Sequence, residues 1–93
     1  MRHRVLKVHE DDNVIVALTN LSKDETVSLN GDQWTLQEAI PAKHKFATTD
    51  LAPGDPVYMY GVLVGKAQAP IRRGQLLSTA NITMQFGPKP LFE

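Results

Sequence analysis

The sequence contains no cysteine among its 93 residues. Disulfides, thiolate catalysis and cysteine-ligated zinc are therefore excluded together. Charge of one sign is not in excess either, because ten Lys and Arg residues balance ten Asp and Glu residues. Nucleic-acid-binding proteins usually carry a clustered basic excess, so we expect no nucleic-acid partner.

Long apolar runs are also missing. The longest, Val14–Leu18, is far too short to span a bilayer, so we expect no membrane partner. The first residues, Met1–Lys7, are charged and lack a hydrophobic stretch, so we expect no signal peptide. These absences together predict a cytoplasmic protein. Its hydrophobic content of 42% is ordinary for a globular fold, and its length predicts a single domain.

Sustained helical periodicity is absent, and a seven-residue pattern occurs four times instead. The pattern is an apolar residue, two variable residues, a turn residue, two variable residues and a second apolar residue. Glycine adopts a positive φ without steric cost and aspartate tolerates it, so Lys43 departs from the pattern. Short strands joined by tight turns are typical of a compact β-domain. The copies are Leu21…Asp24…Val27, Ile40…Lys43…Phe46, Leu51…Gly54…Val57 and Ile71…Gly74…Leu77.

The first half of the chain shows two strand patterns and a hairpin. Residues 4–9 alternate, with Leu6 and Val8 on one face, as in a half-exposed strand. Val14–Leu18 reads as a strand buried on both faces. Asn30-Gly31 favours a type I′ turn between strands at 26–29 and 34–36. Residues 36–40 fit one helical turn that ends at Pro41.

The second half is punctuated by proline and glycine. Val57–Tyr60 reads as a strand, and a return strand begins at Val62–Val64 and continues toward Pro70. Eight or so short strands without a covering helix predict an all-β clip or small barrel. We expect one domain over residues 1–93, with a core at about 4–82 and a C-terminal arm at 83–93.

Few residues in this sequence carry chemistry on their own. His44 lies between two lysines, which favour its neutral form as a base or metal ligand, although the triplet equally fits a solvated turn. His3 and His9 read as surface residues. Tyr60, beside Gly61, is a candidate for ligand contact or for rim packing. Arg72-Arg73 fits either an anion-binding turn or a solvated pair.

The order of these features resembles one family. The residues that carry the resemblance begin with Asp12-Asn13-Val14-x-Val16-Ala17-Leu18 and continue with Ile40–Ala47, Asp50–Gly54, Tyr60-Gly61, Gly65, Ala67, Ile71 and Gly74. The series is similar to the N-terminal SAF domain of altronate dehydratase and related sugar-acid dehydratases. It covers roughly residues 4–82. The resemblance implies a β-clip fold and a place in removing water from sugar acids or related hydroxy acids.

The same resemblance implies partners, a cofactor and site residues. In the fused enzymes a large C-terminal domain does most of the catalysis, and some relatives split the two parts into separate chains. A large dehydratase subunit is thus the implied partner. The implied cofactor is a divalent metal, iron or manganese, bound mainly by that partner. His44 matches a catalytic position, with Lys45, Tyr60 and Asn81 at substrate-binding positions.

Two departures from the family pattern keep a second hypothesis open. The family usually has glycine where this chain has Lys43, and it often has a His-x-His pair where this chain has Ser78 and Ala80. Neither replacement is a good metal ligand, so the metal ligands of this chain stay unassigned, with His44 as a candidate. The first hypothesis is the small subunit of a hydro-lyase, inactive alone. The second is a non-catalytic, homo-oligomeric module that binds or scaffolds.

Overall fold

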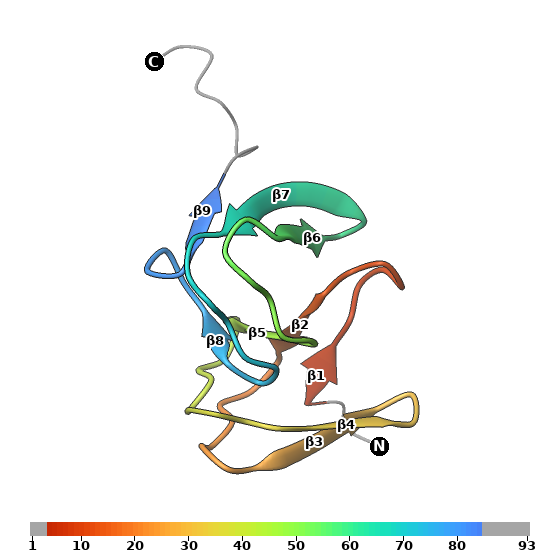
Figure 1. Cartoon of the computed structure of the whole chain (residues 1–93). Helices are drawn as coiled ribbons and strands as arrows, with labels where there is room; N and C mark the ends of the chain where they lie inside the picture. Colours follow the sequence, from red (N-terminus) through yellow and green to blue (C-terminus); the bar gives the residue numbers. More distant parts are fainter. Residues whose placement is uncertain (1–3, 85–93) are drawn as a thin grey trace.

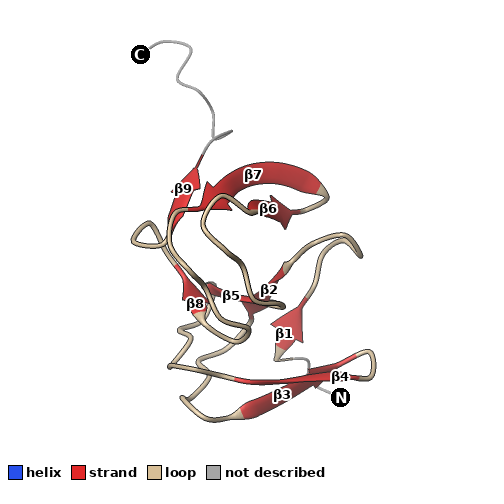
Figure 2. Ribbon diagram, viewed as in Figure 1, coloured by secondary structure: helices blue, strands red, loops and turns tan. Residues whose placement is uncertain are grey.

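A computed structural model describes residues 4–84, which form nine strands and no helix (Figures 1 and 2). Over this range no helix is long and apolar enough to cross a membrane. The prediction of an all-β fold is confirmed. The strands are β1 (Val5–Leu6), β2 (Val14–Ala17), β3 (Thr26–Leu29), β4 (Asp32–Thr35), β5 (Lys45–Ala47), β6 (Pro56–Met59), β7 (Val62–Ala67), β8 (Leu76–Leu77) and β9 (Ile82–Met84).

The strands form three antiparallel sheets. A four-stranded sheet in the order β1-β2-β5-β8 lies in the middle, with the β3-β4 hairpin on one side and the β6-β7-β9 sheet on the other (Figure 1). β9 continues to Met84 by pairing with β7, beyond the predicted core boundary at residue 82. Two other predicted features lie outside the described residues. These are His3 and residues 85–93 of the predicted C-terminal arm.

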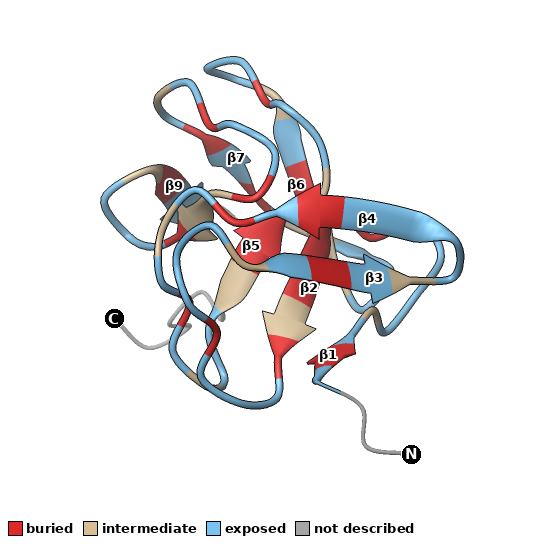
Figure 3. Cartoon of the chain, turned by 90° about the horizontal axis from the view of Figure 1, so that it is seen from below, coloured by how far each residue is buried: buried red, intermediate tan, exposed pale blue. Residues whose placement is uncertain are grey.

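The middle sheet contributes to two hydrophobic cores. Successive side chains of a strand point to opposite faces, so Phe46 of β5 enters one core and Ala47 enters the other. The first core includes Val27 and Trp34 from the β3-β4 hairpin. The second includes Val57 of β6 and residues of β7 and β9. Figure 3 shows buried positions alternating with exposed ones along β3, as expected for a strand with one covered face.

The seven-residue pattern is confirmed at each of its positions. All eight apolar ends are buried, none of them more than 7% exposed. The middle residues all have positive φ: 68° at Asp24, 73° at Lys43, 95° at Gly54 and 86° at Gly74. Lys43 therefore departs from the pattern in sequence and follows it in backbone conformation. The copies are linked in pairs, since Leu21 bridges Ile40 and Leu51 bridges Ile71.

Two tight turns close the hairpins. Asn30-Gly31, with φ of 52° and 88°, joins β3 to β4 and confirms the predicted hairpin, although β4 begins at Asp32, two residues earlier than expected. Tyr60-Gly61, with φ of 58° and 76°, makes an equivalent turn between β6 and β7. Positive φ at both turn residues is the signature of a type I′ turn. Tyr60 is thus a turn residue and not the last residue of a strand.

The predicted helical turn at residues 36–40 is wrong. The amide of Leu36 donates to the carbonyl of Glu25, and Ile40 exchanges two backbone hydrogen bonds with Leu21. These partners lie on other segments, so tertiary pairing overrides the local preference of this short stretch. Leu36 and Ile40 are both completely buried as a result.

The predicted orientation of the first strand is also wrong. Val5 is the residue buried in the first core, whereas Leu6 and Val8 are 46% and 45% exposed. The register of β1 on β2 pairs Val5 with Ala17, whose side chain enters that core. Directly opposite residues share a face, so Val5 follows Ala17 inward and Leu6 points away.

Candidate functional site

His44 ends the turn of the second repeat copy, directly before β5. Its amide donates to the carbonyl of Pro41, 3.0 Å away, and its carbonyl accepts a hydrogen bond from the amide of Ala17 at 2.8 Å. The imidazole is exposed, and its Nδ1 lies 3.3 Å from the carbonyl oxygen of Ala42. The backbone of His44 is therefore fixed in the middle sheet, and the ring is accessible to solvent.

The other three repeat copies use the residue equivalent to His44 to hold their turns. In each, the side chain accepts a hydrogen bond from the backbone amide three residues earlier. The second copy has Pro41 at that earlier position, and proline has no amide proton to donate. His44 is consequently released from the hydrogen bond that its counterparts make. Those counterparts are Glu25 to Ser22 at 2.9 Å, Asp55 to Ala52 at 2.8 Å, and Gln75 to Arg72 at 2.8 Å.

The first of these turns is also charged. Arg4 forms an ion pair with Glu25. The hydrogen bond from Arg4 lowers the pKa of the Glu25 carboxyl below its ordinary value of 4.5, and the Ser22 amide adds to this. The same hydrogen bond raises the pKa of Arg4. The ion pair connects the residue before β1 to the turn before β3.

Lys45, the first residue of β5, lines a small pocket. The pocket has a volume of about 170 Å³ and lies over the second core. Lys45 is half-buried and pairs with Leu77 of β8 in the middle sheet. His44 is not among the pocket residues, so Lys45 lines the pocket and the neighbouring His44 does not. Lys45, Ser78 and Thr79 supply the polar part of the lining, and Val57, Met59, Val64, Leu77 and Ile82 supply the apolar part.

The residues at the end of the domain form a fixed turn. Asn81 Oδ1 accepts a hydrogen bond from the Ser78 amide, and Asn81 Nδ2 donates to the carbonyl of Leu76, both at 2.9 Å. Gln68 Nε2 donates to the carbonyls of Thr79 and Ala80, each at 3.0 Å. The side chain of Asn81 thus has a structural role between β8 and β9. Its assignment to substrate binding stays a prediction.

A buried carboxylate holds Tyr60 in place. Asp12 is 4% exposed and accepts hydrogen bonds from the amides of His9 at 3.1 Å, Tyr60 at 3.0 Å and Gly61 at 2.8 Å. The ring of His9 covers Gly61 so closely that an added Cβ there would lie 2.9 Å from His9 Cδ2. Tyr60 is 56% exposed and does not line the pocket of Lys45.

The residue beside Asp12 completes this connection. Asn13 Oδ1 accepts from the Tyr58 amide, and Asn13 Nδ2 donates to the carbonyl of Pro56, both at 2.8 Å. Asn13 thus binds β6, and Asp12 binds the turn that follows it. In the sequence, the match of Asp12-Asn13 to the family series was the signal that this segment mattered.

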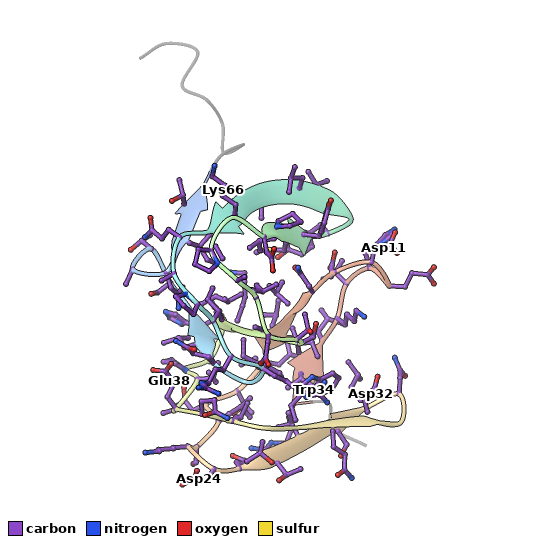
Figure 4. The ribbon with its side chains drawn as sticks, in the orientation of Figure 1. Asp11, Asp24, Asp32, Trp34, Glu38 and Lys66 are labelled. Carbon is purple, nitrogen blue, oxygen red and sulfur yellow. The ribbon has the colours of Figure 1, made fainter. Side chains whose placement is uncertain are left out.

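Arg73 is engaged inside the domain. Its guanidinium donates to the carbonyls of Thr48 and Gln33, and its Cζ lies 5.1 Å from the centroid of the Trp34 ring. Trp34 extends from β4 into the interior (Figure 4) and donates from Nε1 to the carbonyl of Thr48 at 2.9 Å. A cation over an indole face is a favourable contact. Arg73 is exposed, and these contacts connect the β3-β4 hairpin to the segment that follows β5.

A divalent metal does not fit the described residues by themselves. Among residues 4–84 no group of three or more His, Asp or Glu side chains is arranged to hold a metal. His44 offers a single imidazole, and neither Ser78 nor Ala80 is a good metal ligand. Stable binding of iron or manganese requires several strong ligands on one centre, which this donor set lacks.

Comparison with known proteins gives the same family across nearly the whole chain. The model of the altronate/galactarate dehydratase SAF domain matches residues 3–85. Altronate dehydratase of Escherichia coli (strain K12) is 42% identical over 69 residues, which cover 74% of this chain. Altronate dehydratase of Bacillus subtilis (strain 168) is 29% identical over 76 residues, or 82% of this chain.

The matched relatives differ in how much of their length the match covers. The match spans 14% of the Escherichia coli protein and 15% of the Bacillus subtilis protein. Subunit alpha of (2R)-sulfolactate sulfo-lyase from Chromohalobacter salexigens is 36% identical over 50 residues, which are 54% of this chain and 53% of that subunit. The family match covers the repeats, the turn of His44 and the pocket of Lys45, and this chain belongs to the altronate/galactarate dehydratase SAF domain family.

Proposed function

We propose that this chain is the small subunit of an altronate dehydratase-like hydro-lyase. It acts on a sugar acid or a related hydroxy acid together with a separate large catalytic chain. Family membership supports the reaction class. The small share of the two dehydratases that it matches supports a division of labour with a larger part. The likeness to a sulfo-lyase subunit alpha supports a separate small chain.

The release of His44 from its turn carries the proposal. At three of four equivalent positions the side chain is needed to hold the backbone. At the fourth, Pro41 removes that need, and the imidazole lies exposed on a backbone fixed in the middle sheet. A side chain that is not needed to hold the amide of its turn, on a backbone fixed in a sheet, is well suited to act on a substrate held by a partner.

The roles follow from the chemistry of dehydration beside a carboxylate. The reaction needs a base for the α-proton, stabilisation of the charge that develops on the carboxylate, and an acid for the departing hydroxide. His44 is the proposed acid or base, because an imidazole exchanges protons near neutral pH. Lys45 is the proposed partner of the substrate carboxylate. The divalent metal of the family is assigned to the large chain, since the described residues do not fit it.

The proposal is tested by reconstitution with the large chain. The tagged 93-residue chain is used to isolate its partner, and dehydration of a panel of sugar and hydroxy acids is followed. We expect a dehydratase-like partner, no activity from either chain alone, and loss of activity with His44→Ala. The matched control is Asp55→Asn at the equivalent turn position, which leaves the activity of the complex unchanged. Full activity of the His44→Ala complex would exclude the proposed role.

A second candidate function is a non-catalytic module that assembles with itself. The observation in its favour is the exposed apolar pair Leu6 and Val8, with Leu18 also 47% exposed on the adjoining segment. Ser78 and Ala80, at positions where the resemblance implies histidines, also favour a non-catalytic module. Sedimentation velocity of the purified chain separates the two. A stable homo-oligomer without a large partner supports the module, and a monomer that binds a large chain supports the subunit.

A further inference from the structure

The pocket of Lys45 joins a cation to an apolar surface. Lys45 is half-buried, and the described residues place no carboxylate within ion-pair distance of its ammonium group. Side chains of Val57, Val64 and Ile82 line the same pocket. The ammonium group is therefore available to pair with the carboxylate of a ligand whose apolar part lies in the pocket.

The composition of the lining limits what else the ligand carries. Beyond the lysine, only Ser78 and Thr79 among the lining residues bear polar side chains, and both are exposed at the rim. The interior of the pocket consists of aliphatic residues and Met59. Hydroxyl groups placed against them would lose their hydrogen bonds to water without replacement, which is unfavourable. A polyhydroxylated chain is therefore disfavoured inside, and a hydrocarbon end is favoured.

The volume of the pocket indicates the size of ligand that it accepts. An apolar cavity of about 150 Å³ is large enough for benzene. The volume here is about 170 Å³, so a short alkyl chain fits within the pocket. Ser78 and Thr79 are the exposed residues of the lining, and Lys45 is half-buried beside them in the same pocket.

We propose that this pocket binds a short-chain 2-hydroxy acid with an unsubstituted alkyl end. The carboxylate pairs with Lys45 at the rim, and the alkyl end lies against Val57, Val64 and Ile82. The inference rests on the role given to Lys45 in the proposed function and narrows its substrate class. It concerns binding by this chain, so it holds or fails whether or not a large catalytic partner is found.

Two acids with the same carbon skeleton test the inference. The full chain, labelled with ¹⁵N and ¹³C, is titrated with 2-hydroxybutyrate and separately with erythronate, which carries hydroxyls along the same skeleton. We expect 2-hydroxybutyrate to shift the amide signals of Lys45, Ser78 and Thr79 and the methyl signals of Val57, Val64 and Ile82. Erythronate should bind much more weakly. Equal or tighter binding of erythronate would overturn the preference, and no shift with either acid would overturn the site.

Matched variants separate charge from shape. Lys45→Met keeps the length of the side chain and removes the charge, and about tenfold weaker binding is expected from the loss of a charge-assisted hydrogen bond. Lys43→Met, on the exposed lysine of the same turn, should bind as the wild type does. Val64→Phe fills the pocket from β7 and leaves Lys45 in place, so it should abolish the methyl shifts. Unchanged binding by a folded Val64→Phe variant would exclude the pocket.

Discussion

The carboxylate of Asp12 accepts a hydrogen bond from the amide of Gly61, 2.8 Å away and 49 positions along the chain. The same carboxylate accepts hydrogen bonds from the amides of His9 and Tyr60. One buried anion thereby joins the turn after β1 to the turn between β6 and β7. No cation contributes to this contact within the described residues, so backbone dipoles alone stabilise the charge.

Asp12→Asn should lower the free energy of unfolding by about 2 kcal/mol, the scale of a hydrogen bond to a charged group. The amide nitrogen of asparagine would face backbone N–H donors in place of an acceptor oxygen. Urea denaturation followed by Trp34 fluorescence measures the change. Asp11→Asn, on the exposed neighbour, is the control and should stay within about 0.5 kcal/mol of the wild type. Equal effects of the two substitutions would contradict the role of the buried carboxylate.

The two repeat glycines should respond differently to alanine. Gly54 and Gly74 have φ of 95° and 86°, so alanine is strained at both, at a cost of about 1 kcal/mol. A Cβ at Gly54 would meet nothing within 4 Å, whereas at Gly74 it would lie 2.4 Å from the carbonyl oxygen of Thr35. Gly74→Ala should therefore cost roughly a further 1–3 kcal/mol.

Thermal unfolding of the two glycine variants under the same conditions gives the comparison. The cost of a positive φ is common to both variants, so the difference between their losses of stability measures the effect of the contact with Thr35. A Gly54→Ala variant as destabilised as Gly74→Ala would show that backbone strain, and not this contact, dominates.

The four repeat turns predict a contrast in stability at equivalent positions. Asp55→Ala removes the acceptor for the Ala52 amide and should cost about 1 kcal/mol. His44→Ala removes no such bond, because Pro41 has no amide proton, and should change stability by less than about 0.5 kcal/mol. Chemical denaturation of both variants tests this. A His44→Ala variant as unstable as Asp55→Ala would mean that the imidazole does support the fold.

Acid should weaken the ion pair of Arg4 and Glu25. The pKa of Glu25 is lower in the folded chain than its ordinary value of 4.5, so the folded state binds fewer protons on this group than the unfolded state does. The resulting stabilisation is complete above about pH 4.5 and is lost as the pH falls through the lower folded pKa. Glu25→Gln keeps an acceptor for the Ser22 amide and removes the charge.

The wild type should therefore be more stable than Glu25→Gln at neutral pH, and the difference should shrink as the pH falls below about 4.5. Urea midpoints measured across that range give the difference. High salt should reduce it at neutral pH, because both side chains are partly exposed. A difference that does not change with pH would contradict an electrostatic origin.

Local patterns in the sequence predict much of this fold. The eight buried ends of the repeats and the turn at Asn30-Gly31 depend on residue type at short spacing, and the structure confirms them. The errors come from contacts between distant segments. Leu36 and Ile40 are drawn into backbone pairing with Glu25 and Leu21, which no local pattern indicates.

The candidate site also combines residues that the sequence indicated with an arrangement that only the structure shows. His44 and Tyr60 were candidates from the residues alone, and the resemblance to a family added Lys45 and Asn81; the roles of all four toward substrate stay predictions. The pocket of Lys45 combines residues of β5, β6, β7, β8 and β9, so it could not be read from any one segment. The release of His44 by Pro41 was visible in the sequence in principle, but it becomes meaningful only once the hydrogen bonds of the other three turns are known.

The position of β5 between the two cores has a consequence for motion. Phe46 and Ala47 belong to opposite cores, so neither core can open without disturbing this strand. Amide exchange should accordingly be slowest on β2 and β5 and fastest toward the outer hairpin and the edge strand β1. His44 and Lys45 thus lie beside or in the strand that both cores hold, and under the proposed function any adjustment around a substrate would come from the large chain or from the outer parts of this domain.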